Sequence, residues 1–160
     1  MKTAYLSLGS NLGDREAQLR AAIERLNASG IRVIRASSIY ETEPQDMIEQ
    51  PWFLNMALEI ETDLLPLQLL SQIQQIEKEM GRQREVPKGP RTIDIDMLFY
   101  GDEVVTASAL LIPHPSLGLR RFVLEPLAEL APNLRHPVLG RTIAEMLPAT
   151  AAQRVRRWNG

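Results

Sequence analysis

The segment from residue 53 to residue 62 constrains the fold more than any other part of the chain, because its side chains alternate strictly. The even positions are apolar and the odd positions are mixed: Leu54, Met56, Leu58 and Ile60 against Phe53, Asn55, Ala57 and Glu59. A period of two places these sets on opposite faces of a β-strand. The pattern therefore predicts a sheet with one apolar face, which a second layer has to cover.

Two segments with a helical period can supply that layer. The first follows Asp14, a good N-cap, and ends before Gly30; its apolar positions fall at i, i+3, i+4 and i+7 and are Leu19, Ala22, Ile23 and Leu26. The second opens at Pro66, an early helical position, and runs to about Met80, where Gly81 closes it. We expect two helices, each with one apolar side.

Three further segments are predicted to be strands, at residues 4–8, 31–40 and 92–99. The resulting order, β-α-β-β-α-β, is the split βαβ pattern of a ferredoxin-like α+β fold: an antiparallel sheet of about four strands with both helices on one face. The other face is expected to be open for a ligand. Residues 41–52 are too long for a tight hairpin turn, which predicts a functional lid or, alternatively, an ordinary exposed loop.

The pattern is less regular after Gly101. It predicts a short strand at residues 103–105 and a helix at about residues 122–130, followed by a mixed tail. We expect this part to be a C-terminal elaboration that shores up the sheet. Residues 1–160 have the length of one ordinary domain, and no linker or repeat suggests a boundary within them.

The composition excludes several classes of protein. The chain has no cysteine, which removes disulfide scaffolds, thiol nucleophiles and cysteine-bound metals, and favours the cytoplasm. Polar residues interrupt the N-terminal apolar run, so neither a signal peptide nor a membrane span is expected, and the protein should be soluble. The net charge of −2 argues against binding to long nucleic acids, and a phosphate-bearing metabolite fits better.

Asp94 and Asp96 form the strongest local signal for chemistry. In a strand they point to one side while Ile93, Ile95 and Met97 point to the other, so two carboxylates stand side by side. Such a pair is most easily explained by a bound divalent cation, and ligation by oxygen alone favours magnesium. The alternative is that both aspartates are simply solvated on an edge strand.

Three arginines, Arg82, Arg84 and Arg91, flank the loop that leads into this strand. Their planar guanidinium groups would neutralise a polyphosphate close to the metal carboxylates, an arrangement typical of phosphoryl transfer. Alternatively, they form surface ion pairs with the glutamates nearby, Glu77, Glu79 or Glu85. The sequence has neither a phosphate-binding loop of the Gly-x-x-x-x-Gly-Lys-Ser/Thr type nor a Gly-x-Gly-x-x-Gly motif, so a nucleotide has to be bound in another way.

Single polar residues in the second half of the chain add to these signals. Glu77 falls within the apolar arc of the second helix, with Gln74 at its edge, and a carboxylate in that position needs a partner or a ligand. His114 lies between two prolines that restrict its backbone, and we expect it to contact a ligand. His136 has a less distinctive context and is expected to be structural.

Taken together, these motifs resemble the 6-hydroxymethyl-7,8-dihydropterin pyrophosphokinase family (2-amino-4-hydroxy-6-hydroxymethyldihydropteridine diphosphokinase). The resemblance extends from residue 8 to about residue 132 and is carried by residues 53–55, 81–84, 89–96 and 113–114. It implies transfer of the pyrophosphoryl group of ATP to the pterin hydroxymethyl oxygen in folate biosynthesis, with AMP as the diagnostic product. It also implies two magnesium ions bridged by Asp94 and Asp96.

The resemblance assigns roles to individual residues as well. The residues that match pterin-pocket positions are Thr42, Phe53, Asn55 and Phe122. The residues that match nucleotide-site positions are Gln74, Glu77, Arg84, Ile95, Met97 and His114, and those that match phosphate-facing or catalytic arginines are Arg82, Arg91 and Arg120. The chain departs from the common pattern in three places, because Pro87 and Lys88 replace a basic residue and an aromatic one, residues 43–47 lack a glycine, and Ala109 replaces a basic residue.

Two other classes of function remain open at this point. A ferredoxin-like module that senses a nucleotide or a metal would bind ATP without producing AMP. A metal-dependent phosphohydrolase would use Asp94 and Asp96 to activate water and would consume ATP without pterin. For the pyrophosphokinase we expect ATP and the pterin as small-molecule partners, no nucleic acid, no membrane, and a monomer.

Overall fold

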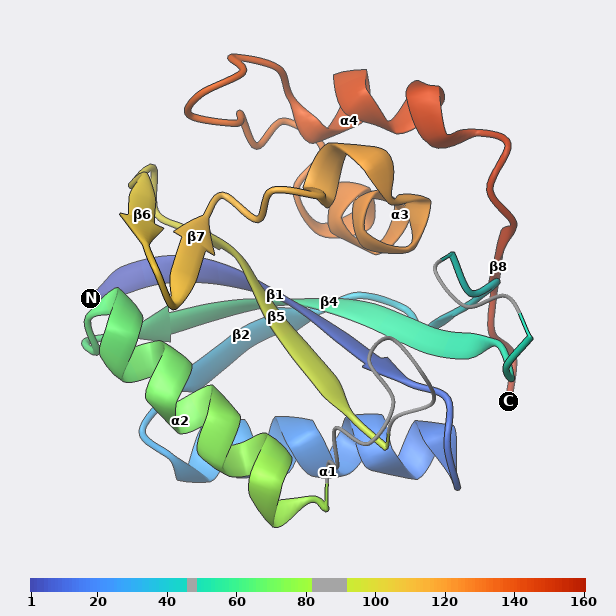
Figure 1. Ribbon diagram of the computed structural model, residues 1–160, viewed down its shortest axis with the longest axis horizontal. Coiled ribbons are helices and arrows are strands. Elements are labelled where there is room, and N and C mark those ends of the chain that lie inside the picture. Colours follow the sequence, from blue (N-terminus) through green and yellow to red (C-terminus); the bar gives the residue numbers. More distant parts are fainter. Residues whose placement is uncertain (46–48, 82–91) are drawn as a thin grey trace.

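The computed structural model describes residues 1–45, 49–81 and 92–160. Its central layer is an antiparallel sheet in which β1 (Lys2–Ser10) lies between β4 (Phe53–Thr62) and β5 (Asp94–Tyr100). The strand order is β5-β1-β4-β3-β8, and β2 (Arg32–Ala36) also pairs with β4. The short strands β3 (Tyr40–Thr42) and β8 (Val155–Arg157) extend the sheet at one end (Figure 1).

Two helices, α1 (Arg15–Ala28) and α2 (Pro66–Glu79), cover the same face of this sheet (Figure 1). The side chain of Asp14 accepts a hydrogen bond from the backbone N–H of Ala17 and caps α1, as its position in the sequence predicts. Gly30 adopts a φ of 78°, which allows the chain to turn back after α1. The ferredoxin-like α+β class is therefore confirmed, and the predicted β-α-β-β-α-β order differs only in that three strands, β2, β3 and β4, lie between the two helices.

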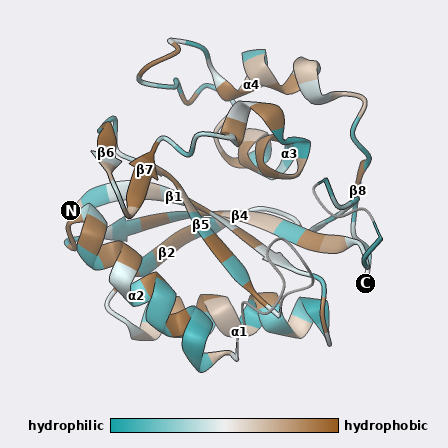
Figure 2. Ribbon diagram, viewed as in Figure 1, coloured by the Kyte–Doolittle hydropathy of each residue, from teal (hydrophilic) through white to brown (hydrophobic). Residues whose placement is uncertain are grey.

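The main core lies between these helices and the sheet. Even-numbered residues of β1 and β4 point into it together with the inner sides of α1 and α2; fully buried members include Leu6, Leu8, Leu58, Ile60, Leu19, Leu26 and Leu69. Figure 2 shows the apolar residues of the sheet and of α2 alternating with polar ones along each element. The face assignment predicted for residues 53–60 is correct, because burial of the even positions supplies most of the driving force on this side.

The opposite face is open only in part, which corrects the expectation of a free face. α3 (Arg121–Leu130), α4 (Ile143–Met146) and two 3₁₀ turns, η1 (Leu117–Leu119) and η2 (Leu147–Thr150), lie over it (Figure 1). They bury a second apolar cluster that includes Ala57, Leu98, Phe99, Leu124 and Leu127. The apolar half of this face needs a cover, and the C-terminal elaboration provides it.

Several boundaries differ from the predictions. The strand expected at residues 31–40 is divided into β2 and β3, because the Ser37 hydroxyl accepts the N–H of Ala57 at 2.9 Å in place of a regular ladder partner. The strand expected at residues 103–105 is a hairpin, β6 (Val105–Ala107) with β7 (Leu110–Ile112). Residues 46–48 of the predicted lid lie outside the described residues. In the described part of the chain, no helix has the length and the apolar content that a membrane span requires.

Candidate active site

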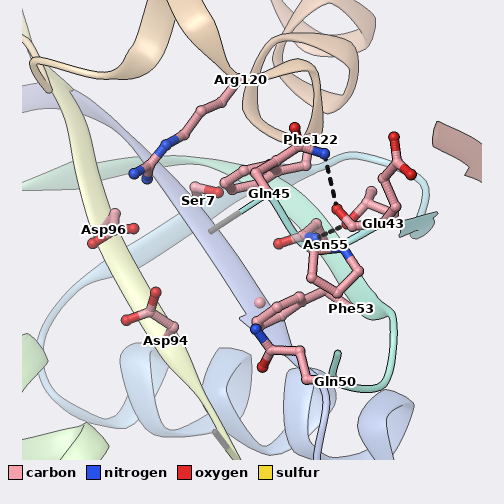
Figure 3. A pocket seen from close by; sticks show the side chains of 13 residues that line it. Ser7, Glu43, Gln45, Gln50, Phe53, Asn55, Asp94, Asp96, Arg120 and Phe122 are labelled. Atoms are coloured by element: carbon pink, nitrogen blue, oxygen red, sulfur yellow. Dashed lines mark hydrogen bonds between the residues drawn. The ribbon is translucent and has the colours of Figure 1, made fainter. Parts of the chain in front are cut away.

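The uncovered half of the second sheet face is polar, and three strands build it. Ser7 and Gly9 of β1 pair with Asp96 and Asp94 of β5, and Gly9 also pairs with Asn55 of β4. Alternate residues of a strand point the same way, and paired residues share a face. The register therefore gathers a hydroxyl, an amide and two carboxylates on one surface, as Figure 3 shows for these side chains.

A narrow cavity of about 40 Å³ lies over this surface. All four residues assigned to the pterin pocket line it, and the Phe53 and Phe122 rings come from β4 and from the start of α3 (Figure 3). We call it the pterin-side cavity. The Asn55 amide donates a hydrogen bond of 2.6 Å to the Thr42 hydroxyl, and both residues are almost fully buried.

Gly9 makes room for this arrangement. A Cβ at position 9 would lie 2.6 Å from Oδ1 of Asn55 and 3.6 Å from Cδ1 of Phe53. Any other residue at this position would therefore displace the Asn55 amide, which its hydrogen bond to Thr42 holds in place. A glycine in the interior of a strand is expected where two groups approach closely in this way.

A second cavity, the nucleotide-side cavity, lies between α2, β5 and the segment after β6. Of the described residues assigned to the nucleotide, Gln74, Glu77, Ile95, Met97 and His114 line it, whereas Arg120 lines the pterin-side cavity. Glu77 is 6% exposed, and its Oε2 accepts the backbone N–H of Ile95 at 2.8 Å. This hydrogen bond gives the buried carboxylate a partner, as expected for a carboxylate in the apolar arc of a helix. It also fixes β5, the strand that carries Asp94 and Asp96.

Asp94 and Asp96 line both cavities. Their side chains point from β5 toward the pterin-side cavity in Figure 3, while the residues between and after them, Ile95 and Met97, face the nucleotide side. The two carboxylates therefore stand at the border between the two cavities.

The two histidines have different surroundings. The backbone N–H of His114 donates to the carbonyl of Leu98 at 3.1 Å, and its Nδ1 accepts the N–H of Ser116 at 3.2 Å. Burial lowers the pKa of His114, the charge of Arg120 lowers it further, and Asp94 opposes both effects, so the imidazole is neutral at pH 7. His136 instead packs edge-on against Phe99, with 5.9 Å between ring centres.

Arg120 belongs to the pterin-side cavity. Its guanidinium lies 5.5 Å from the centre of the Phe122 ring and extends toward β5 in Figure 3. It can therefore steady the ring and bring positive charge toward the carboxylates at the same time. Arg82, Arg84 and Arg91, together with Pro87 and Lys88, lie outside the described residues.

Sequence reasoning missed several residues that line the cavities. Ser7 and Gly9 lie on the same face of β1 as Tyr5, the face that points away from the main core. The alternation of β1 therefore indicated that both residues belong to the ligand-facing side. Glu43, Pro44, Gln45 and Gln50 come from the loop between β3 and β4, whose course no periodicity predicts. On the nucleotide side, Ser108 and Leu111 come from the hairpin that was predicted only as one strand.

Comparison with known proteins identifies the family. The family model described as 7,8-dihydro-6-hydroxymethylpterin-pyrophosphokinase (HPPK) matches residues 5–132, most of the chain. The chain belongs to this family. The identification made from the sequence motifs is therefore confirmed, and the two cavities and the aspartates between them lie within or against the matched region.

Two bacterial relatives match over most of their own length, and both are named 2-amino-4-hydroxy-6-hydroxymethyldihydropteridine pyrophosphokinase. The protein of Bacillus subtilis is 51% identical over 128 residues, which cover 79% of this chain and 77% of the relative. The protein of Pseudomonas aeruginosa is 39% identical over 163 residues, which cover 100% and 99%.

Longer relatives match this chain over only part of their own length. The folic acid synthesis protein fol1 of Pneumocystis carinii is 45% identical over 143 residues, and the chain spans 19% of its length. A solved structure of Plasmodium falciparum HPPK-DHPS has a TM-score of 0.74 at 18% identity, covering 95% of this chain and 44% of that one. At that level of identity, the similarity supports the fold alone.

Proposed function

We propose that this chain transfers the pyrophosphoryl group of ATP to the hydroxymethyl oxygen of 6-hydroxymethyl-7,8-dihydropterin, as the names of its bacterial HPPK relatives describe. One observation carries the proposal: Asp94 and Asp96 line both the pterin-side and the nucleotide-side cavity. A reaction between two bound ligands needs a shared border where the transferring group is held. In folate biosynthesis, the products would be AMP and the pterin diphosphate.

The pterin-side residues would orient the acceptor. The Phe53 and Phe122 rings would stack on the bicycle, and the Asn55 amide, fixed by Thr42, would read its polar edge. The hydroxymethyl oxygen would then form a bond to the β-phosphorus while the bond from this atom to the α,β-bridging oxygen breaks. AMP leaves with the electron pair, and the hydroxyl proton is released to solvent.

The nucleotide-side residues would hold ATP. Gln74, Glu77 and His114 offer polar atoms, and Ile95 and Met97 offer apolar surface beside them. Arg120, Arg82 and Arg91 would stabilise charge on the transferring and leaving groups, and Arg84 would contact the nucleotide. These assignments rest on the family motifs and, for the described residues, on their position in the cavities.

The donor set suits magnesium. Asp94 and Asp96 provide carboxylate oxygens, and within residues 1–45, 49–81 and 92–160 no group of three or more His, Asp or Glu side chains could hold a metal ion. Magnesium is commonly bound by one or two carboxylates, with substrate phosphates and water as the remaining ligands. Two bound ions would neutralise polyphosphate charge and fix its orientation.

The test is an AMP-release assay with four arms: with and without the pterin, and with and without magnesium. We expect AMP only when both are present, in a one-to-one ratio with the pterin diphosphate. Release of orthophosphate or pyrophosphate without pterin would instead identify a phosphohydrolase. Binding of ATP without any AMP would identify a sensing module.

We also propose that the chain acts as a single monomeric domain in the cytoplasm. The two cavities lie against one sheet and share Asp94 and Asp96, which supports a single domain, and the absence of cysteine suits a reducing compartment that contains ATP. Sedimentation of the active protein at micromolar concentration would test the monomer. A dimer that dissociates together with loss of activity would contradict it.

A further inference from the structure

The C-terminal segment of residues 153–158 lies beyond the region matched by the family model, yet it contacts residues of the pterin-side cavity. In β8 it pairs with β3, which places Val155 opposite Thr42. The N–H of Glu43 donates to the carbonyl of Arg154 at 3.1 Å, and the N–H of Arg154 donates to the Glu43 carboxylate at 2.8 Å. Thr42 and Glu43, which both line the cavity, are therefore fixed from this side.

Glu41 connects the segment with the two ends of the loop between β3 and β4. Its carboxylate is nearly buried and accepts hydrogen bonds of 3.0 Å from Nε of Arg156 and from Arg15. Arg15 also donates to the carbonyl of Trp52 at 2.9 Å, and the Arg156 guanidinium lies 5.6 Å from the centre of the Trp52 ring. Glu41 directly precedes Thr42, and Trp52 directly precedes Phe53. The contacts of Arg15 and Arg156 therefore hold the neighbours of two cavity residues.

The folded structure keeps the Glu41 carboxylate charged between Arg15 and Arg156. Burial alone would raise the pKa of the Glu41 carboxyl, but hydrogen bonds from Arg156 and Arg15 outweigh burial and hold the pKa below its usual range. The carboxylate is therefore ionised at neutral pH, and both arginines keep a charged acceptor. Each arginine also lies over an indole, Arg156 over Trp52 and Arg15 over Trp158.

The same segment reaches the opposite wall of the cavity through Gln153. Its side-chain oxygen accepts the N–H of Arg121 at 2.8 Å, its carbonyl accepts the Arg121 guanidinium at 2.9 Å, and its side-chain nitrogen donates to the carbonyl of Leu119 at 2.8 Å. Arg121 stands between Arg120 and Phe122, the two cavity residues at the start of α3. The cavity thus has two walls that residues 153–158 contact. One wall is formed by Thr42 and Glu43 after β3, and the other is formed by Arg120 and Phe122 at the start of α3.

We propose that residues 153–158 form a strap that sets the separation of the two walls of the pterin-side cavity, with Arg156 and Gln153 as positioning residues for the pterin. The inference rests on the proposed function, since it names the pterin as the occupant. Arg156 acts through Glu41 and Trp52, and Gln153 acts through the start of α3. The nucleotide-side cavity is built on α2, β5 and the β6–β7 hairpin, so its ligand should be affected far less.

The test compares Arg156→Ala with two matched variants. Arg156→Lys keeps the charge beside Glu41, and Arg157→Ala removes the neighbouring arginine of β8, whose contacts go to Tyr40 and Glu129 instead. Calorimetry gives the pterin Kd in the presence of a non-hydrolysable ATP analogue, and the analogue is also titrated alone. Steady-state rates give KM for each substrate and kcat.

We expect Arg156→Ala to raise the pterin Kd and KM by about 10-fold, which corresponds to a loss of about 1.4 kcal/mol of binding free energy. The Kd of the ATP analogue should stay within about two-fold, Arg156→Lys should recover most of the loss, and Arg157→Ala should leave pterin binding near wild type. Gln153→Ala, which acts on the other wall, should shift the pterin values in the same direction even if Arg156→Ala folds poorly.

Equal losses for pterin and ATP, or equal effects of Arg156→Ala and Arg157→Ala, would show that the tail only stabilises the fold and would overturn the strap. An unchanged pterin Kd in both Arg156→Ala and Gln153→Ala would do the same. A wild-type protein that makes no AMP would contradict the proposed function, which is a separate result read from a separate assay.

Discussion

Gly9→Ala is the change whose consequence the structure defines most directly. The new methyl group would lie 2.6 Å from Oδ1 of Asn55, whereas a relaxed contact between carbon and oxygen needs more than 3 Å. Asn55 is 3% exposed and is bonded to Thr42 at 2.6 Å, so the amide cannot move aside without breaking that bond. The new methyl group would also lie 3.6 Å from the Phe53 ring, so β1 has little room to shift toward that ring.

The expected cost follows from these contacts. Overpacking a well-filled site costs about 1–3 kcal/mol. Replacing glycine by alanine returns about 0.4–1 kcal/mol, because the unfolded chain has fewer conformations to lose. Gly9→Ala should therefore destabilise the protein by about 1.3 kcal/mol, the midpoint of a range from about 0 to 2.6 kcal/mol. Because the Asn55 amide is displaced, the change should also weaken pterin binding by about 10-fold or more.

Urea unfolding and pterin calorimetry measure the two effects, with Gly118→Ala as the control. A Cβ at position 118 would meet Met146 at 3.8 Å, an ordinary contact, so this variant should be neutral or slightly more stable. In an Asn55→Ala background, Gly9→Ala should lose most of its cost, since the clashing oxygen is gone. A cost that is the same in both backgrounds would refute the steric explanation.

Three further predictions concern single carboxylates. Asp96→Asn should keep the fold, as circular dichroism would verify, and lower AMP turnover by at least about 100-fold, because a metal-compensating charge is lost; near-normal turnover would remove the metal assignment. Glu77→Gln can still accept the Ile95 N–H but should weaken ATP by about 1–3 kcal/mol in calorimetry, with the pterin Kd measured without nucleotide nearly unchanged. Glu41 has a lowered pKa in the folded protein, so its contribution to stability is present above the ordinary carboxyl pKa of about 4.5 and is lost as the pH falls below it. Glu41→Gln should therefore show a smaller drop in Tm between pH 6 and pH 3.5 than the wild type. An equal drop in both proteins would contradict this explanation.

The features that the sequence predicted correctly are those that a local period determines. The alternation of residues 53–60 assigns each side chain to a face without knowledge of its neighbours, and the same rule placed Asp94 and Asp96 together. Glu77 was expected to be buried because it falls inside a helical arc, and it is. Local patterns carry this information because helices and strands have fixed periods.

The features that the sequence did not predict depend on contacts between distant segments. Ser7 lies opposite Asp96 only because β1 and β5 adopt one register, which neither strand encodes alone. The break at Ser37 depends on a hydroxyl bond to Ala57, twenty residues away. The tail likewise has no period of its own, so pairing of β8 with β3 could not be inferred from composition or spacing.

The junction between the tail and the cavity also gives the protein its own optical reporter. The chain has two tryptophans, and both belong to this junction: Trp52 lies beside Arg156, and Trp158 donates its indole N–H to Glu16 at 3.0 Å while Arg15 lies over its ring. Their ultraviolet emission therefore samples one corner of the molecule and not the fold at large. Emission that changes well before far-ultraviolet circular dichroism during unfolding would report early release of the C-terminal segment while the remaining sheet is still intact.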